Sequence, residues 1–533
     1  ELPFGWPLGC HRLEWNMPGV SWETWLISTS SHAFSPGKTG RGWGLFAPLY
    51  ALHSRRSWGA GDLGDLRQFL EWTASRGGTM VGTLPLLPVF LDQPFDPSPY
   101  APVSRLFWNE FYLDLTRAPE VAACPETQRL LRSSGFVRRI DSLRRDALVD
   151  YRHQMALKRR VLEIAARFLF GNSSPRRDDF SRFMQAHPEV EDYSYFRAVH
   201  EAQQSPWSTW PERLRRREWR TGDYLEESRR YHLYAQWVAH EQMENLAAEA
   251  RRRGVSLYLD LPLGVHAEGY DVWRRRDLFV LEADGGAPPD PGFPSGQNWG
   301  FPPMHPEKMR AEGYGYLRAV LRHHLQLAGA LRLDHVMGLH RLYWIPHGQS
   351  AADGVYVRYP AGELYALLCL ESQRQQVIMV GENLGTVPPV VNTALKRHRA
   401  RQSFVVQYEL LSGQCSALRS VPSLAVASMN THDMPPFNAF WQGLDLDEQS
   451  RLGIVDKARA KQQKQQRRLI KQQLIRFLSN QGRLKTSRPN AEAVLEACLA
   501  HLSAAKVEWV LVNLEDMWLE IAPQNVPSTA QGA

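Results

Sequence analysis

The chain has 533 residues, of which 43% are hydrophobic and 22% are charged, and its formal net charge is +7. This composition is typical of a globular protein with a large core and more than one structural unit. The basic residues occur in scattered runs without a nucleic-acid-binding motif, so we expect no nucleic-acid partner. No apolar run reaches the ~18 residues that a membrane span needs, so we expect no membrane partner either.

The sequence contains five cysteines, and no two of them form a C-x-x-C pair. A sparse and odd set of cysteines argues against a disulfide framework and is typical of a reducing compartment, so we expect a cytoplasmic protein. The opening stretch Glu1–Cys10 is not a signal peptide and does not begin with Met. Either end could therefore be cut, which would hide a targeting segment.

Residues 1–40 do not share the pattern of the rest and are expected to be a linker or the tail of a possible N-terminal domain. From residue 41 onward, short apolar runs end in Gly, Pro, Asp or His, which predicts buried strands. Eight such runs follow one another, at Gly42–Leu52, Thr79–Val89, Val255–Val265, Gly329–Val336, Gln376–Gly385, Ser403–Leu410, Leu424–Asp433 and Val507–Trp518.

Helical patterns separate most of these runs, which indicates a parallel sheet covered on both faces. Eight repeats of strand and helix predict an α/β fold, a (β/α)8 TIM barrel formed by residues 41–533. Residues 90–253 are far more chain than one crossover needs, and their pattern is mostly helical, so we expect an inserted subdomain after the second strand. A Gly- and Pro-rich stretch after the third strand, His266–Pro303, predicts a long structured loop over the C-terminal face.

Acidic and basic side chains gather where the predicted strands end. Asp260 lies in the third run, Arg332, Asp334 and His335 end the fourth, Glu382 ends the fifth, and His432 and Asp433 end the seventh. The carboxyl ends of barrel strands meet on one face, so these groups should share a cleft. Any one of these acids alone is more often a cap or a salt-bridge partner, but acids from several strands together favour catalysis or metal binding.

A metal centre is the less favoured of these two hypotheses, because these strand ends carry no H-x-x-x-H or D-x-D pair. Two carboxylates beside an anomeric carbon are the groups that cleave glycosidic bonds, one as nucleophile and one as general acid and base. Arg332 and Asp334 are two residues apart and therefore share a strand face, so the arginine would favour an ionised Asp334. A Glu in a water-poor cleft can have the raised pKa that a general acid needs.

The sequence resembles the 4-α-glucanotransferases, or amylomaltases, of glycoside hydrolase family 77. The resemblance runs from about Leu2 to Thr529. It rests on ten motifs in order, namely RGWGLFAPLYAL, SWGAGDLGDL, DPSPYAPVSR, LDLPLGV, GAPPD, GQNWGFPP, LRLDHVMGL, GENLGTVP, NTHDMP and QNVPST. It implies a retaining enzyme that transfers α-1,4-glucan segments between maltooligosaccharides, with no cofactor and no metal.

By match to those motifs, Asp334 resembles the nucleophile, Glu382 the general acid/base, and Asp433 a third carboxylate that binds sugar hydroxyls and helps to strain the ring. The positions that resemble substrate contacts are Arg332, His335, His432, Asp260, Trp299, Gln297, Tyr100, Ser98 and Asn525. Simpler explanations stay open for some of them: Trp299 and Tyr100 could be packing residues, and Ser98 could only cap the turn before Pro99.

Three features depart from the family pattern. Asn383 follows Glu382 where the family commonly has Asp, Ser528 stands where Gly is usual, and the chain stops at Ala533 where a basic tail generally follows. The glycosyl-enzyme can be released by water or by a sugar, so an α-amylase-type hydrolase and a non-catalytic glucan-binding protein remain as alternatives. The oligomeric state is not predicted.

Overall fold

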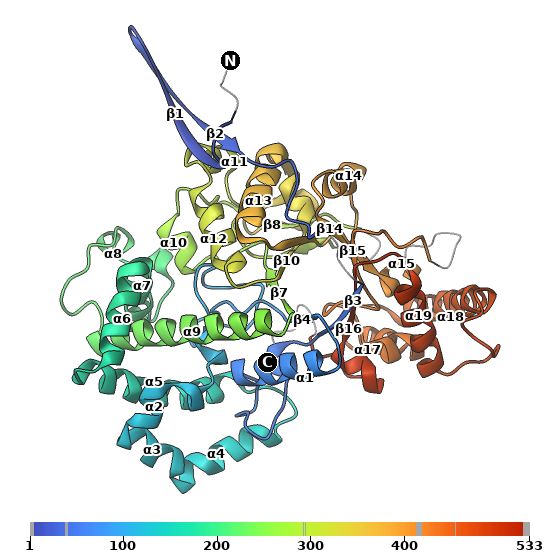
Figure 1. The fold of residues 1–533 in the computed structure, drawn as a ribbon, viewed down its shortest axis with the longest axis horizontal. Helices are drawn as coiled ribbons and strands as arrows, with labels where there is room; N and C mark the ends of the chain where they lie inside the picture. The colour runs from blue at the N-terminus through green and yellow to red at the C-terminus, as the bar shows by residue number, and fades with distance from the viewer. Residues whose placement is uncertain are drawn as a thin grey trace.

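The computed structural model describes residues 5–37, 41–290, 293, 295–411, 418–453 and 455–525. At its centre is a closed barrel of eight parallel strands in the order β10-β13-β14-β15-β16-β3-β4-β7 (Figure 1). The barrel strands are β3 (Gly42–Phe46), β4 (Met80–Gly82), β7 (Ser256–Leu261), β10 (Ala330–Leu333), β13 (Ile378–Gly381), β14 (Arg401–Val405), β15 (Ala425–Ser428) and β16 (Trp509–Asn513). The predicted TIM barrel is confirmed, and each of the eight predicted runs contains one strand or overlaps it.

The strands are shorter than the apolar runs that predicted them, because each run continues past the barrel wall. The clearest case is Ser403–Leu410, where the strand ends at Val405 and the helix α15 (Val406–Leu411) takes over. The backbone N–H of Gln407 donates to the carbonyl of Met429 at 2.9 Å, so this turn is tied to the neighbouring strand's end. The apolar pattern does not mark this change, because Val406 and Leu410 are buried in the helix as they would be in a strand.

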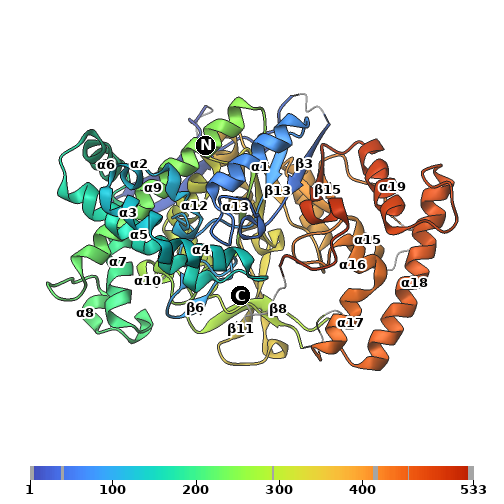
Figure 2. The ribbon, with the colours of Figure 1, turned by 90° about the horizontal axis from the view of Figure 1, so that it is seen from below.

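Helices cover the outside of the barrel between consecutive strands. The helix α1 (Leu63–Ser75) links β3 to β4. At its N-terminus the Asp62 side chain accepts the backbone N–H of Asp65, and the Asp65 side chain accepts that of Asp62, so the two form a capping box. The other barrel helices are α12 (Gly315–Leu325) before β10, α13 (Ala361–Gln375) before β13 and α14 (Pro389–Arg397) before β14. Four helices lie between β15 and β16 in the sequence and appear on the right in Figure 2. They are α16 (Phe437–Gln442), α17 (Leu444–Arg451), α18 (Lys457–Asn480) and α19 (Ala491–Ala504).

The chain between β4 and β7 is largely helical and lies on the opposite side of the barrel from α16–α19 (Figure 2). Its helices are α2 (Pro119–Ala123), α3 (Pro125–Arg132), α4 (Ser134–Arg145), α5 (Tyr151–Gly171), α6 (Pro175–Ala186), α7 (Glu189–Gln203), α8 (Glu212–Arg215) and α9 (Glu226–Arg252). The longest of them, α9, buries aromatic and aliphatic side chains such as Tyr234 and Trp237, and it leads directly into β7. A short hairpin, β5 (Phe90–Leu91) with β6 (Phe95–Asp96), begins this segment.

A four-stranded antiparallel sheet follows the barrel strands β7 and β10, in the order β12-β11-β8-β9. Its strands are β8 (Ala283–Ala287), β9 (Gln297–Asn298), β11 (Arg341–Pro346) and β12 (Val355–Arg358). In the sequence the helix α10 (Tyr270–Arg274) precedes β8, and the helix α11 (Pro306–Ala311) follows β9. The backbone N–H of Trp299 donates to the carbonyl of Gly285 at 2.9 Å. This sheet holds the Gly- and Pro-rich loop that the sequence predicts.

The N-terminal residues form a long antiparallel hairpin, β1 (Gly9–Met17) with β2 (Val20–Ser28), which extends away from the barrel in Figure 1. Its base contacts the body of the protein through Trp25, whose Nε1 donates to the carbonyl of Ala311 at 3.2 Å. Its far end is exposed on both faces. The assignment of residues 1–40 to a linker or an N-terminal domain stays a prediction. In the part of the chain that the structure describes, no helix has the length and apolar character needed to cross a membrane.

Candidate active site

The acidic and basic residues at the predicted strand ends lie on neighbouring strands of the barrel. In the register of β7, β10 and β13, Arg332 stands beside Asp260 on one side and beside Val380 on the other. Asp334 and Glu382 each follow the last residue of their strand by one position, after β10 and β13. His432 and Asp433 follow β15 after a short turn. The structure therefore brings Asp260, Arg332, Asp334, Glu382 and Asp433 to one end of the barrel.

Arg332 is the central cation of this cluster. Its Nη1 donates to both carboxylate oxygens of Asp260 at 2.8 Å, and its Nη2 lies 3.0 Å from Oδ1 of Asp334. The guanidinium is nearly buried, and a buried cation needs such partners to offset its lost hydration. The predicted pairing of Arg332 with Asp334 is present, and Asp260 completes the charge balance.

Tyr100 joins the strand ends to the segment after β4. Its hydroxyl donates to Oδ2 of Asp260 at 2.6 Å and lies 2.7 Å from Nε2 of His432. The imidazole of His432 is stacked between the rings of Tyr100 and Phe46, with centroid separations of 5.4 and 5.7 Å. Tyr100 therefore packs through its ring, against His432, and makes polar contacts through its hydroxyl, with Asp260 and His432.

Asp334 has a raised pKa of about 6, because burial outweighs the favourable charge of Arg332 and because Asp260 and Asp433 add negative charge. The spacing of Arg332 and Asp334 predicts that the arginine favours an ionised Asp334, and its charge does lower this pKa. The net shift is nevertheless upward, because desolvation and the charges of Asp260 and Asp433 together exceed the effect of Arg332. A carboxyl with this pKa is still mostly ionised at neutral pH.

Glu382 has a pKa raised to about 7, mainly by burial and further by the charge of Asp334, while Arg332 opposes the shift. Its two oxygens accept backbone N–H groups, Oε2 from His335 at 3.0 Å and Oε1 from Leu384 at 2.5 Å. His335 has a left-handed backbone with φ of 45°, which is uncommon for a residue with a side chain. The residue with this conformation is the one whose backbone N–H donates to Oε2 and so orients the Glu382 carboxyl.

Asp433 has a pKa held below its ordinary value, because the charges of His432 and Arg332 together outweigh the effect of burial. Its Oδ2 lies 3.1 Å from Nε2 of His432, and its Oδ1 accepts from Nδ2 of Asn525 at 3.3 Å. Asn525 also donates to the carbonyl of His432 at 3.1 Å. The structure thus places Asn525, close to the chain's end, directly against the third carboxylate.

The remaining predicted contacts lie at the edge of this cluster. The ring of Trp299 meets that of His335 edge-on at 5.0 Å and stacks on Phe301 at 6.1 Å. Gln297 pairs with Ala287 in the sheet beside it. The Oγ of Ser98 accepts from the backbone N–H of Tyr100 at 3.3 Å, as a residue that caps a turn does.

Three side chains near the site were not singled out in the sequence. Tyr50 donates from its hydroxyl to the carbonyl of Gln524 at 3.1 Å and so holds the segment that carries Asn525. Tyr408, in α15, has a phenol whose pKa is raised by burial and by the nearby Glu382. Glu515, which follows β16, has a pKa raised to about 7 by burial, in spite of His432. Tyr50 and Tyr408 lie in apolar segments that are typical of a core, so the sequence offered no signal for them. Glu515 could have been found, because it is an acid at the end of the eighth predicted strand.

Asn383, one of the departures from the family pattern, bonds to the neighbouring strand β14 and to the helix α14. Its Oδ1 accepts from the backbone N–H of Ser403 at 2.9 Å, and its Nδ2 donates to Oδ1 of Asn392 at 2.8 Å. The amide suits this position because it can donate and accept at once. The other departure, Ser528, lies outside the described residues. Across the described ranges, no group of three or more His, Cys, Asp or Glu side chains is arranged to hold a metal ion.

A parallel barrel with opposed carboxylates at its strand ends is typical of enzymes that act on glycosidic bonds. A family model described as 4-alpha-glucanotransferase, of glycoside hydrolase family 77, matches residues 47–533. The chain belongs to this family of 4-α-glucanotransferases.

Individual relatives agree with this membership. The chain is 32% identical to a 4-alpha-glucanotransferase of Haemophilus influenzae, across 98% of this chain and 79% of the relative. It is 30% identical to a 4-alpha-glucanotransferase of Mycobacterium tuberculosis, across 99% of this chain and 75% of the relative. The crystal structure of amylomaltase from Corynebacterium glutamicum is similar with a TM-score of 0.88 and 27% identity, covering 99% of this chain and 75% of that one.

Proposed function

We propose that the chain transfers α-1,4-linked glucan segments between maltooligosaccharides by double displacement, with Asp334 as nucleophile and Glu382 as general acid and base. The observation that carries the proposal is the pair itself: the partly exposed Asp334 and the buried Glu382, on the adjacent strand ends of β10 and β13, with pKa values of about 6 and about 7. Two carboxyls whose pKa values are both raised toward neutral pH allow one group to be ionised while its neighbour holds a proton.

In the first step the Asp334 carboxylate attacks the anomeric carbon of the donor sugar, and Glu382 gives its proton to the departing glycosidic oxygen. Arg332, 3.0 Å from Asp334, supports the ionised carboxylate before attack. In the second step Glu382 removes the proton from an acceptor's 4-hydroxyl, whose oxygen attacks the anomeric carbon and frees Asp334. Two inversions retain the α configuration.

Asp433, ionised and held by His432 and Asn525, is the group that we assign to the hydroxyls of the sugar at the cleavage point. A carboxylate accepts two hydroxyl hydrogen bonds and tightens them as positive charge develops at the anomeric carbon. Asp260 and Tyr100 support this subsite from below through Arg332 and His432. The buried pair of Asp260 and Arg332 has enough partners to stay in one geometry, which is what the chemistry needs.

Trp299 and His335 form one edge of the proposed glucan path, and Gln297 and Ser98 are further contacts. Trp299 is half-buried in a loop held by the sheet of β8 and β9, so part of its ring remains available to a sugar face. The Ser98 hydroxyl is engaged within its own turn, so a contact with glucan would have to use its remaining hydrogen-bonding capacity. The long insertion and this loop would favour transfer over hydrolysis if they keep water from the glycosyl-enzyme.

The test uses maltotriose alone, with free glucose, longer maltooligosaccharides and total reducing ends followed together. Transfer produces glucose and longer products while the number of reducing ends stays constant. Reducing ends that rise without longer products would mean that water is the acceptor and that the chain is a hydrolase. No reaction at all, with glucan still bound, would leave only a binding role.

We also propose that the enzyme works in the cytoplasm without a metal, a cofactor, or a nucleic-acid or membrane partner. The sparse cysteines support a reducing location, and the paired carboxyls supply the acid, base and nucleophile by themselves. Full transfer activity in a chelator agrees with this proposal, and activity lost to the chelator and restored by calcium contradicts it.

A further inference from the structure

A cavity of about 640 Å³ lies outside the barrel, between the helical insertion and the barrel helix α12. Its walls come from the start of α7, the middle of α9, the helix α10 and the outer face of α12, together with the segment Leu106–Trp108. The described residues that line it do not include Asp334, Glu382 or Asp433. Its volume lies within the range of ordinary small-molecule sites.

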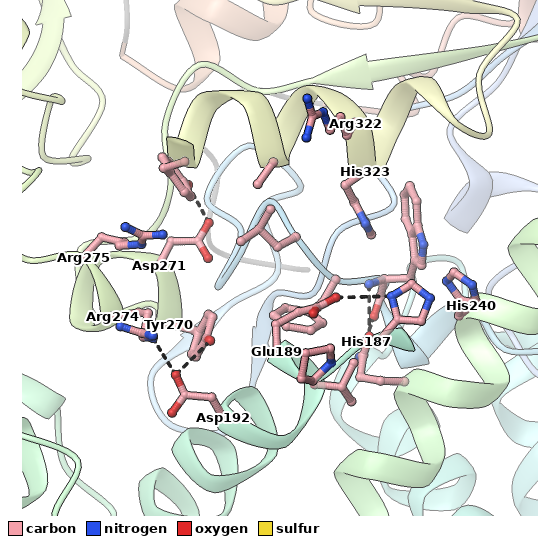
Figure 3. Close-up of a pocket in the computed structure, with 18 of the residues that line it drawn as sticks. His187, Glu189, Asp192, His240, Tyr270, Asp271, Arg274, Arg275, Arg322 and His323 are labelled. Carbon is pink, nitrogen blue, oxygen red and sulfur yellow. Dashed lines mark hydrogen bonds and ion pairs between the residues drawn. The ribbon is translucent and has the colours of Figure 1, made fainter. Parts of the chain in front are cut away.

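One end of the cavity carries a fixed polar network. Arg274 lies with its Nε 2.6 Å from Oδ2 of Asp192, and the hydroxyl of Tyr270 donates to the same oxygen at 3.2 Å. Figure 3 shows these three side chains together on one side of the cavity, from α7 and α10. Both charged side chains stay partly exposed, so each keeps hydrogen-bonding capacity toward the cavity.

Three imidazoles form the other end, and each comes from a different segment. His187 and His240 lie with their ring centroids 4.6 Å apart, and His323 reaches down from α12 toward them (Figure 3). His323 is stacked on Trp108 at 4.2 Å, and its Nε2 is buried with no hydrogen-bond partner among the described residues. A buried ring nitrogen without a partner costs free energy unless something else satisfies it.

Two of the imidazoles, those of His240 and His323, have lowered pKa values and so favour the neutral state. Burial lowers the pKa of His240, and the charge of His187 lowers it further, against the opposing effect of Glu244. Burial and the neighbouring histidines also hold the pKa of His323 well below its ordinary value. A neutral imidazole has one donor and one acceptor, which matches a hydroxyl group rather than a phosphate or carboxylate.

The formal charges of the lining are also nearly balanced. Four arginines and three acidic residues line the cavity. Of the arginines, Arg275 and Arg322 already pair with Glu312 and Glu371 outside it, at 3.2 and 2.8 Å. Arg274 is paired with Asp192, so Arg217, which is exposed, is the lining arginine that remains for an anion, whereas a neutral ligand rich in hydroxyl groups would meet both donors and acceptors. The apolar part of the wall suits the carbon face of a sugar ring.

We propose that this cavity is a second binding site for a neutral saccharide, a short maltooligosaccharide or its end, separate from the catalytic cleft. The ligand class follows from the lining, and only the choice of α-1,4-linked glucan as the ligand rests on the proposed function. A glucan chain held at this site would raise the local concentration of substrate near the barrel.

The test counts binding sites by calorimetry on the full chain, with Asp334→Asn to prevent turnover and maltotetraose as the probe. Ala319, an exposed residue of α12 that lines the cavity, is replaced by Trp to fill it. Ala123, an exposed helical residue outside the cavity, receives the same substitution as the matched control. Thermal unfolding of both variants verifies that the fold is kept.

We expect two maltotetraose sites in the parent and in Ala123→Trp, and one in Ala319→Trp, with the lost site weakened by about tenfold or more. His187→Phe keeps the ring shape without its nitrogens and should weaken the same site. An Ala319→Trp variant that keeps both maltotetraose sites overturns the proposal. The proposal is also overturned if the substitution removes a site for inorganic phosphate or glucose 1-phosphate and no site for maltotetraose. The maltotriose reaction is measured separately on the enzyme that keeps Asp334, so a failure of the proposed function is told apart from a failure of this site.

Discussion

At the scale of single residues, the site works by balancing burial against charge. Arg332 touches Asp260 and Asp334, and its charge lowers the pKa of Asp334 and Glu382, yet burial raises both pKa values above their ordinary range. Each carboxyl therefore titrates close to neutral pH, where a proton can be given and taken back at little cost. The balance depends on every charged neighbour, so single substitutions should change it in predictable directions.

Replacing either proposed catalytic carboxyl should abolish transfer while leaving the fold intact. Asp334→Asn removes the nucleophile and Glu382→Gln removes the proton donor, and we expect losses of about a thousandfold or more in kcat for each. Steady-state rates with maltotriose measure the effect, and circular dichroism verifies the fold. A near-normal rate in either variant would mean that the role assigned to that residue is wrong.

The pH dependence of kcat/KM should be bell-shaped and narrow. Activity needs Asp334 ionised, so it rises as the pH passes about 6, and it needs Glu382 protonated, so it falls as the pH passes about 7. The maximum is expected between these two values. A profile that stays flat from weakly acid to weakly alkaline pH would contradict the assignment.

Arg332→Met offers a check on the cause of those pKa values. Arg332 favours the ionised form of both carboxyls, so its removal should shift both limbs of the profile to higher pH. Arg332→Lys, which keeps the charge, is the matched control and should shift them less. Both limbs staying in place in Arg332→Met would show that the arginine's charge does not tune the pair.

At the scale of elements, the sheet of β8, β9, β11 and β12 positions the loop that carries Gln297 and Trp299. Gly286 in β8 lies so close to β9 that an added Cβ would stand 2.2 Å from the carbonyl oxygen of Gln297. Glycine is needed here because the two backbones pack directly together. The edge of the proposed glucan path therefore depends on one close approach between strands.

Gly286→Ala should push β9 away and displace Trp299. We expect KM for maltooligosaccharides to rise by about tenfold, with a smaller effect on kcat, because the displaced residues bind sugar without reacting. Gly362→Ala is the control, since a Cβ there would meet nothing within 4 Å. Equal KM values in the two variants would remove the loop from the substrate path.

At the scale of the whole molecule, the barrel is enclosed on two sides by helices, and the β1–β2 hairpin stands apart (Figure 1). On one face of the hairpin Trp15 and Trp22 are cross-strand neighbours and are 59% and 60% exposed, with Met17 and Val20 beyond them. Exposed apolar faces of this kind usually pack against another surface. The prediction that residues 1–40 are a linker or the tail of a possible N-terminal domain implies that catalysis by the barrel does not need this face of the hairpin.

The double variant Trp15→Ser, Trp22→Ser should leave kcat for maltotriose unchanged and reduce any self-association of the purified chain. Light scattering at several protein concentrations measures the association, and the maltotriose assay measures the catalysis. Trp25→Ser, at the base of the hairpin where the ring packs on Gly313, is the contrasting variant and should lower the unfolding temperature. A loss of catalysis in the double variant would mean that the hairpin takes part in the site.

The sequence alone was sufficient for the barrel and for bringing the charged residues at its strand ends together. Apolar runs separated by helical patterns predict a parallel barrel, because strands buried on both faces have no polar side. Strand ends of a parallel barrel meet on one face, so Asp260, Arg332, Glu382 and Asp433 could be placed together without knowing any distance. The spacing of Arg332 and Asp334 by two residues likewise predicted their contact.

Only the tertiary structure decided how those groups behave. The contact of Tyr100 with Asp260 and the contact of Asn525 with Asp433 join segments far apart in the chain, and no local pattern encodes such pairs. The pKa of Asp334 rises in spite of Arg332 because burial and neighbouring charges are sums over the whole fold. The histidine-lined cavity likewise exists only where α7, α9 and α12 come together. Local residue order determines the secondary structure and its faces, whereas charge balance and cavities depend on which faces meet.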